Sequence, residues 1–358
     1  MDTVTQALLG AAVGQAGFSQ KLGRRALVWG AVGGLLPDLD VLVMAGGDPF
    51  AEFVYHRGST HSLWFGPVAG PILGWLIWRI YRWRGRDGPG EPGAPSMQSA
   101  WMALMALALF THPLIDVFTS YGTQLLAPFS RERFALDAVG IVDFTYSGIL
   151  LVGLGVGCFL HRKGRNPQTA AWLALALSWS YLGYGWWLNE RAETQVEFTL
   201  AQAGHTEAEV NSYPTFVQPY LRRFVARSGN QIWVGLHTPL GGGVTHWEQF
   251  EATRPHPLVA RLLATPRGEI FDWFAMGEVA ARVLPDPLGF AVEIDDLRYG
   301  FPEHPQRGMW GIRGVFDSDA KPIGRVERIR LSPPSGLSLG SLWDAMRGDF
   351  STLLRQGP

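Results

Sequence analysis

The sequence is poor in cysteine and in charged residues, and each shortage excludes a class of structure. Its 358 residues include a single cysteine, Cys158, so a monomer can form neither a disulfide nor a cysteine-rich zinc site. Charged residues make up 17%, against roughly 25% in an average soluble chain. The formal net charge of -1 gives no reason to expect a nucleic acid as partner. A metal site in this chain would therefore use histidine, aspartate and glutamate.

A basic segment is also missing at the N-terminus, which reads MDTVTQALLG and carries Asp2 instead. We therefore expect no cleaved signal peptide here and expect these residues in the mature protein. Apolar and aromatic residues are abundant in contrast. The chain is 47% hydrophobic and contains 15 Trp and 20 Phe, a composition that suits a protein with membrane interfaces.

The first half of the chain holds six apolar stretches, at about residues 4–18, 26–44, 62–81, 98–116, 146–160 and 169–188. A helix that spans a bilayer needs about 17–25 residues, so the third and sixth stretches are the clearest predicted spans. Glycines recur at small-residue spacings in the first three stretches, which predicts close packing of helices in lipid. They are Gly10, Gly14, Gly30, Gly33, Gly34, Gly66, Gly70 and Gly74.

Beyond Asn189 the composition becomes that of an ordinary folded domain. NQIWVGLHT, GFAVEIDDLRYG and MWGIRGVF alternate like strands, and FDSDAKPIGRVERIRL predicts a hairpin with its turn at Asp317 to Pro322. EIFDWFAMGEVAARVL has helical spacing. The sequence therefore predicts a mainly α protein, with a polytopic transmembrane helical bundle at 1–190 and a C-terminal extracytoplasmic α+β domain at 191–358.

Basic side chains are concentrated in three loops, at 19–25, 82–97 and 161–168. By the positive-inside rule these loops are cytoplasmic. The loops at 45–61 and 117–145 and the whole C-terminal domain then lie on the other side. We expect a multi-pass protein of the bacterial inner membrane, with the lipid bilayer itself as a partner.

Ionisable side chains that are costly in a membrane all fall on the same, non-cytoplasmic side of this topology. They are Asp38, Asp40, His56, Arg57, His61, His112, Asp116 and Asp143. An aspartate at the centre of a spanning helix costs about 2.5–3.5 kcal/mol on insertion scales, so several unpaired ones would cost roughly 10 kcal/mol. A bound divalent cation would offset this cost by replacing water as the partner of the carboxylates.

Each of these signals has an ordinary explanation when taken alone. His112 and Asp116 are spaced i, i+4 and share a helix face, but such a pair is more often a packing or capping pair. The aspartates of PDLD could be solvated at a helix end, His56 could be a loop histidine, and Arg57 could contact a lipid headgroup. Their convergence on one side favours a metal site. Histidine with aspartate suits zinc, and manganese or iron is also compatible.

Five segments, in this order, carry a family resemblance: MDTVTQALLG, LLPDLD, HRGSTHS, THPLIDVFTSYGTQLLAPFS and FALDAVGIVDF. They resemble the YdjM-type family of membrane-bound, metal-dependent hydrolases over about residues 1–190. That family is in turn similar to zinc-dependent phospholipase C. Members often begin Asp-x-x-Thr-His, and Gln6 stands here in place of that histidine. Either one metal of a multinuclear site is lost, or that position is not an essential ligand.

The resemblance and the residues together assign roles. The expected metal ligands are Asp38, His61, His112 and Asp116. The expected catalytic residues are Asp40, His56, Arg57 and Asp143. Asp40 or Asp143 would act as general base or would orient a ligand. His56 would complete the site or protonate a leaving group, and Arg57 would neutralise an anionic phosphate.

We therefore expect an integral membrane hydrolase that uses a divalent metal, zinc above all, on a phosphoester or lipid-linked substrate at the membrane surface. Two other functions stay open. The chain could be a non-enzymatic scaffold or lipid-binding protein whose polar cluster packs helices. It could also be an ion-coupled transporter, although the large C-terminal domain and the surface position of the cluster count against this.

Overall fold

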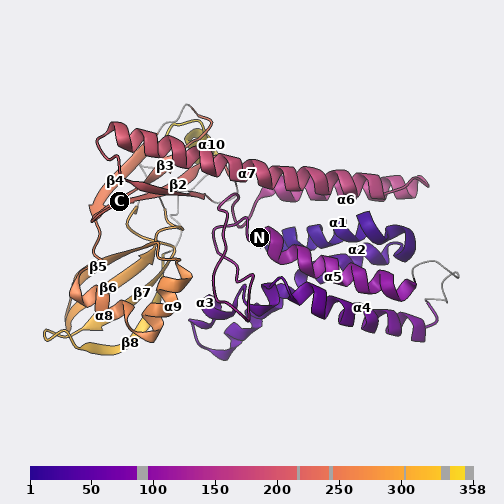
Figure 1. Cartoon of the computed structure of the whole chain (residues 1–358), viewed down its shortest axis with the longest axis horizontal. Helices are drawn as coiled ribbons and strands as arrows, with labels where there is room; N and C mark the ends of the chain where they lie inside the picture. Colours follow the sequence, from indigo (N-terminus) through magenta and orange to yellow (C-terminus); the bar gives the residue numbers. More distant parts are fainter. Residues whose placement is uncertain (87–95, 216–217, 242–244, 302–303, 332–338, 351–358) are drawn as a thin grey trace. The chain divides into compact units, whose positions relative to one another are not determined.

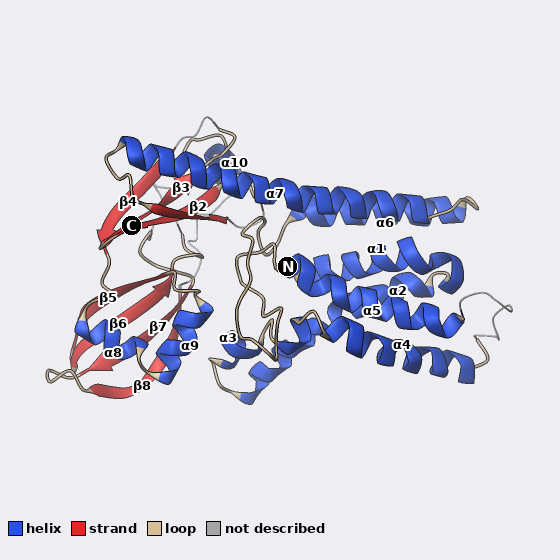
Figure 2. Cartoon of the chain, in the orientation of Figure 1, coloured by secondary structure: helices blue, strands red, loops and turns tan. Residues whose placement is uncertain are grey.

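Residues 1–86, 96–215, 218–241, 245–301, 304–331 and 339–350 are described in the computed structural model of the chain. They divide into two compact units. The helical unit contains Met1–Gly46 and Tyr55–Trp186, whereas the sheet unit contains Gly47–Val54 and most of the chain from Trp187 onward. The eight strands of the described residues all belong to the sheet unit (Figure 2).

The helical unit is built from long helices, of which α1, α2, α4, α5 and α6 run side by side (Figure 1). Its elements are α1 (Thr3–Leu22), α2 (Arg25–Leu35), the 3₁₀ helices η1 (Pro37–Gly46) and η2 (Ser59–His61), α4 (Phe65–Trp83), α5 (Met97–Asp116) and α6 (Phe144–Arg162). Side-chain caps start several of these helices. Asp2 accepts from Val4 N and Thr5 N at the start of α1, and Ser96 accepts from Ser99 N at the start of α5. The first half of α7 (Gln168–Gln202) belongs to this unit and the second half to the sheet unit.

Three helical segments are long and apolar enough to cross a bilayer: Arg25–Val43, Met97–Asp116 and Phe144–Arg162. A fourth span results if the pair Ala51–His61 and Phe65–Trp83, which is bent by 68°, is counted as one. The stretches that we expected to be the clearest spans are therefore not among the three. The stretch at 62–81 qualifies only within the bent pair, and the apolar half of α7 mixes Trp, Tyr, Ser and Gly with its aliphatic residues.

Glycines bring the backbones of α1 and α2 into direct contact, as their spacing predicted. A Cβ atom at Gly10 would lie 2.1 Å from the carbonyl oxygen of Gly30, and one at Gly34 would lie 2.3 Å from that of Gln6. No larger residue fits at these positions unless a helix moves. The contact holds Gln6 against the end of α2, just before Asp38.

Helices α4 and α5 are antiparallel, and glycines bring their backbones into direct contact as well. A Cβ atom at Gly66 would lie 2.7 Å from Phe110 N, and one at Gly74 would lie 2.3 Å from the carbonyl oxygen of Trp101. The start of α4 therefore lies beside the end of α5. This pairing brings η2, which directly precedes α4, to the last turn of α5.

The sheet unit contains two four-stranded antiparallel sheets, each with its strands in sequence order. The first sheet is formed by β1 (Glu209–Pro214), β2 (Arg222–Ser228), β3 (Gln231–His237) and β4 (Thr245–Glu251), and the second by β5 (Val279–Asp286), β6 (Gly289–Asp296), β7 (Trp310–Phe316) and β8 (Pro322–Arg330). Its helices are α8 (Pro257–Leu263), α9 (Pro266–Phe274) and α10 (Leu339–Met346), and α3 (Ala51–Tyr55) begins in this unit. The three predicted strands and the predicted hairpin are confirmed as β3, β6, β7 and the β7–β8 pair.

One prediction in this half was wrong. The segment EIFDWFAMGEVAARVL was expected to be helical throughout, but α9 ends at Phe274 and the rest forms β5. Met276 and Gly277 have φ values of 54° and 80°, in the left-handed region that ends a helix. The residues after this turn pair with β6 along the whole of β5, so pairing across the sheet overrides the helical spacing.

Candidate metal centre

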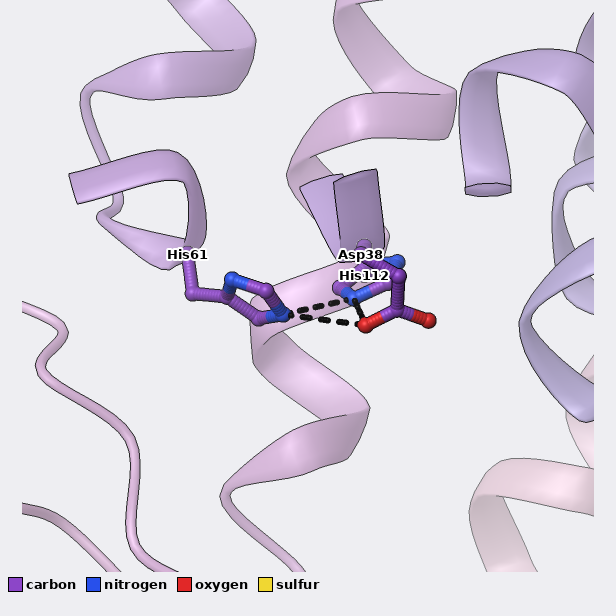
Figure 3. A group of neighbouring side chains, drawn as sticks. All are labelled: Asp38, His61 and His112. Carbon is purple, nitrogen blue, oxygen red and sulfur yellow. Dashed lines mark hydrogen bonds and ion pairs between the residues drawn. The ribbon is translucent and has the colours of Figure 1, made fainter. Parts of the chain in front are cut away.

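Three side chains from three different elements meet in the helical unit. Asp38 lies in the first turn of η1, His61 ends η2, and His112 lies in the last turn of α5. Each offers one ligand atom, and these atoms all lie within 4.8 Å of one another (Figure 3). Both histidines are fully buried, and 14% of the Asp38 side chain is exposed. The glycine contacts of α1 with α2 and of α4 with α5 bring these elements together.

Hydrogen bonds fix which nitrogen of each histidine carries the proton. His112 Nδ1 lies 2.6 Å from the carbonyl oxygen of Gly34, which can only accept, so this nitrogen donates. His61 Nδ1 lies 3.2 Å from Asp40 Oδ2, a carboxylate oxygen that also only accepts. In the neutral rings each Nε2 therefore presents a lone pair, and the two Nε2 atoms lie 2.9 Å apart. Two lone pairs at this distance repel one another unless a proton or a metal ion lies between them.

Two carboxylate oxygens join the two nitrogens. Asp38 Oδ1 lies 3.4 Å from each Nε2, and Asp116 Oδ2 lies 3.3 Å from that of His61 and 3.5 Å from that of His112. With zinc bonds of about 2.0–2.1 Å, neighbouring ligands of a tetrahedral site lie about 3.3–3.4 Å apart. The separations between nitrogen and oxygen thus fit a divalent metal held by Asp38, His61 and His112, whereas the 2.9 Å between the two nitrogens is shorter than a tetrahedral site has.

Asp116 directs one of its oxygens into this cluster. Its Oδ1 accepts from the Met1 ammonium group and from Gln6 Nε2 at 3.0 Å, and Arg57 Nη2 lies 3.5 Å away. Its Oδ2 is buried and has no hydrogen-bond partner among the described residues. A buried acceptor without a donor is rare and costly, which is a second reason to expect a cation here.

Asp40 lies outside the proposed ligand set, and its carboxylate contacts two histidines. His56 Nδ1 donates to Asp40 Oδ1 at 2.8 Å, while His61 Nδ1 lies 3.2 Å from Oδ2. Arg57 N and Thr60 Oγ1 also donate to Oδ2, at 3.0 and 3.1 Å. Asp40 therefore orients His61, as a carboxylate does for many metal-bound histidines.

Arg57 is buried behind Asp116, with 2% of its surface exposed. Its Nη1 donates to Thr119 Oγ1 at 2.7 Å and to the carbonyl oxygen of Asp116 at 3.3 Å. Its guanidinium lies 4.8 Å from the centre of the Tyr121 ring, and that of Arg133 lies 5.3 Å from the same ring. Neither Tyr121 nor Arg133 was predicted from the sequence, since neither stands in a metal-ligand pattern.

Gln6 lies inside the site, where the family resemblance placed a histidine. Its Nε2 donates to Asp116 Oδ1, and its Oε1 is buried without a hydrogen-bond partner among the described residues. The position is therefore adjacent to the cluster, and the glutamine supports Asp116 from the side of α1.

Asp143 lies at a different place from the other candidates. It is the N-cap of α6, accepts from Tyr146 N at 2.9 Å, and receives the hydroxyl of Tyr181 at 2.9 Å. These contacts give it a structural role in joining α6 to α7. Its predicted role as a general base stays a prediction. The structure thus gathers Asp38, Asp40, His56, Arg57, His61, His112 and Asp116, and leaves Asp143 outside the gathered set.

A bundle of apolar helices with a buried histidine and aspartate cluster at the ends of three elements defines a membrane protein with a candidate metal centre. The chain belongs to the YdjM inner membrane protein family, whose model matches residues 1–192. The resemblance drawn from the sequence is thereby confirmed. Neither the curated proteins nor the solved structures give a match.

Proposed function

We propose that this inner membrane protein is a metal-dependent hydrolase acting on phosphoesters, including lipid-linked ones. The proposal rests on one observation: the Nε2 atoms of His61 and His112 lie beside carboxylate oxygens of Asp38 and Asp116, each within 3.5 Å of both nitrogens, while both histidine Nδ1 atoms are held by acceptors. Metal-bound histidines have this arrangement in proteins generally. Asp38, His61, His112 and Asp116 would hold the ion.

The chemistry that a divalent ion supplies when bound is Lewis-acid polarisation of a phosphoryl oxygen and acidification of the attacking water. A divalent ion would also offset the negative charge of the site. The carboxylates of Asp38, Asp40 and Asp116, of which Asp116 is buried, contribute three negative charges, which Arg57 and a divalent ion together would balance. Arg57 Nε is buried and has no hydrogen-bond partner among the described residues, which leaves one donor for a phosphate oxygen.

His56 is the proposed proton carrier. Its side chain is 19% exposed, whereas those of His61 and His112 are fully buried, and its ring centre lies 5.8 Å from that of His61. Asp40 holds the proton on Nδ1, so Nε2 is the nitrogen that accepts. The water oxygen forms a bond to phosphorus while its proton passes to Nε2. The bond between phosphorus and the leaving oxygen breaks, and the same proton passes to that oxygen.

Metal analysis tests this proposal. The wild-type protein, purified without chelator, should contain stoichiometric metal, and His112→Ala should lose it. His161→Ala is the matched control, because His161 is an exposed histidine in the last turn of α6 and its replacement should leave the metal content unchanged. Both variants are then assayed with a chromogenic aryl phosphodiester and a fluorescent phospholipid.

The outcomes separate the enzyme from the non-enzymatic scaffold. A hydrolase loses metal and phosphodiester turnover together in His112→Ala. A wild-type protein that binds no metal would overturn the proposal. So would one that binds metal stoichiometrically and cleaves neither substrate, because the metal would then only hold the helices together.

A further inference from the structure

A cavity of about 310 Å³ lies in the helical unit between α1, α2 and α6, and it is separate from the metal centre. Gln15 and Ser19 of α1 line it, whereas Gln6 of the same helix contacts Asp116. At 1.5 Å per residue, nine to thirteen residues of helix correspond to about 14–20 Å. The volume lies at the lower end of the range for ligand pockets, roughly 300–1,000 Å³, so a headgroup fits and a whole lipid does not.

The walls of this cavity combine cations with apolar side chains. Arg24 of the α1–α2 turn and Arg162 at the end of α6 line it, and both residues are exposed. Leu27 and Val28 of α2 form the apolar part, and Val28 is 61% exposed. The cavity therefore offers positive charge to an anion and an uncovered apolar surface beside it.

The lining also contains a buried carboxamide. Gln15 is 1% exposed, and its Oε1 has no hydrogen-bond partner among the described residues. Its Nε2 lies 3.9 Å from Cys158 Sγ, which is a weak contact. The amide thus retains hydrogen-bonding capacity toward a ligand in the cavity.

From these contacts we infer that the cavity binds the headgroup of an anionic phospholipid. The phosphate lies between Arg24 and Arg162, and an acyl chain continues along Leu27 and Val28. The position supports a lipid over a soluble anion. Leu27 and Val28 belong to the candidate span Arg25–Val43, and Arg162 ends the candidate span Phe144–Arg162, so the cations lie at the level where headgroups lie. The inference does not depend on the proposed hydrolase activity.

The single cysteine gives a direct test, because Cys158 is exposed and lines the cavity. The full-length protein is placed in nanodiscs of phosphatidylcholine alone or with phosphatidylglycerol, and the rate of Cys158 alkylation by the uncharged reagent N-ethylmaleimide is measured. Phosphatidylglycerol should slow the reaction several-fold. Native mass spectrometry of the wild-type protein should show retained phosphatidylglycerol in preference to phosphatidylcholine.

Two double variants of equal charge separate the cavity from the general surface potential. The double variant Arg24→Gln, Arg162→Gln should lose the protection of Cys158. Each arginine near an anionic surface contributes about fivefold to lipid affinity, and both are removed. Lys163→Gln with Arg165→Gln should keep it, since neither of those two side chains lines the cavity. Equal alkylation rates in the two lipid mixtures, or equal loss of protection in both double variants, would overturn the inference. If soluble glycerol phosphate protects Cys158 to the same level, the ligand of the cavity is a free anion and not a lipid.

Discussion

Replacing Asp40 with asparagine removes one acceptor beside the metal centre and leaves the four proposed ligands in place. All four neighbours of the Asp40 carboxylate donate to it: His56 Nδ1 at Oδ1, and Arg57 N, Thr60 Oγ1 and His61 Nδ1 at Oδ2. An asparagine has one acceptor oxygen. The orientation that serves the three donors at Oδ2 places the amide NH₂ against His56 Nδ1. His56 must then carry its proton on Nε2.

The size of the effect follows from these contacts. His61 Nδ1 would donate to a neutral amide instead of a carboxylate. Hydrogen bonds to charged groups contribute about 1.5–3 kcal/mol and neutral ones about 0.5–1.5 kcal/mol, so the loss is about 1–1.5 kcal/mol. We expect the metal dissociation constant to rise about tenfold, at the lower end of the range for residues that orient a ligand. Turnover at saturating metal should fall further, because the protonated Nε2 of His56 cannot accept a proton.

Metal titration of the metal-free protein and phosphodiester hydrolysis at saturating metal measure the two effects separately. Asp38→Asn is the control, because it alters a proposed direct ligand and should remove most of the metal. If Asp40→Asn loses its metal as completely as Asp38→Asn does, Asp40 is itself a ligand. If Asp40→Asn turns over as fast as the wild type, the role given to the pair of Asp40 and His56 is wrong.

Three further predictions concern other parts of the chain. Gln6→His adds an imidazole beside Asp116 and should raise the metal stoichiometry measured by elemental analysis; an unchanged value would show that this position holds no metal. In a cysteine-free background and intact cells, an impermeant maleimide should label Asp319→Cys in the sheet unit and not Arg165→Cys in the basic loop; the reverse pattern would invert the predicted topology. Burial, and next the charge of Arg222, lower the pKa of His237 in β3 from 6.5 to about 4. As the pH falls below 6.5, His237 is therefore protonated in the unfolded chain before it is protonated in the folded chain. The free energy of unfolding decreases by about 2 kcal/mol by pH 5. His237→Asn should remove this loss in thermal unfolding of the intact protein at pH 7 and pH 5, and an equal loss in both proteins would refute the assignment.

The helices and most of the site could be predicted because their signals are local. Long apolar stretches predict helices, the i, i+4 spacing places His112 and Asp116 on one face of α5, and the shared sidedness predicted that Asp38 and His61 would join them. Glycine spacing predicted the close contacts that hold these elements together.

The rest depends on contacts that no local pattern contains. The acceptor for His112 is the backbone carbonyl oxygen of Gly34, and a carbonyl oxygen is present at every residue, so the sequence cannot single it out. The burial of Arg57 behind Asp116 depends on its left-handed backbone, with φ at 57°, which no turn signal predicted. The change from α9 to β5 was missed because the partner strand β6, which decides it, comes later in the chain.

The glycine contact between α1 and α2 has a consequence for biosynthesis. These two helices are neighbours in sequence, so they can pair as soon as both have been synthesised. Asp38 then arrives long before its partner His112, which is encoded 74 residues later. At a synthesis rate of about 5–20 residues per second, the interval is about 4–15 s. The full donor set therefore does not exist when the first hairpin forms, and metal loading of the proposed site would have to follow the synthesis of α5.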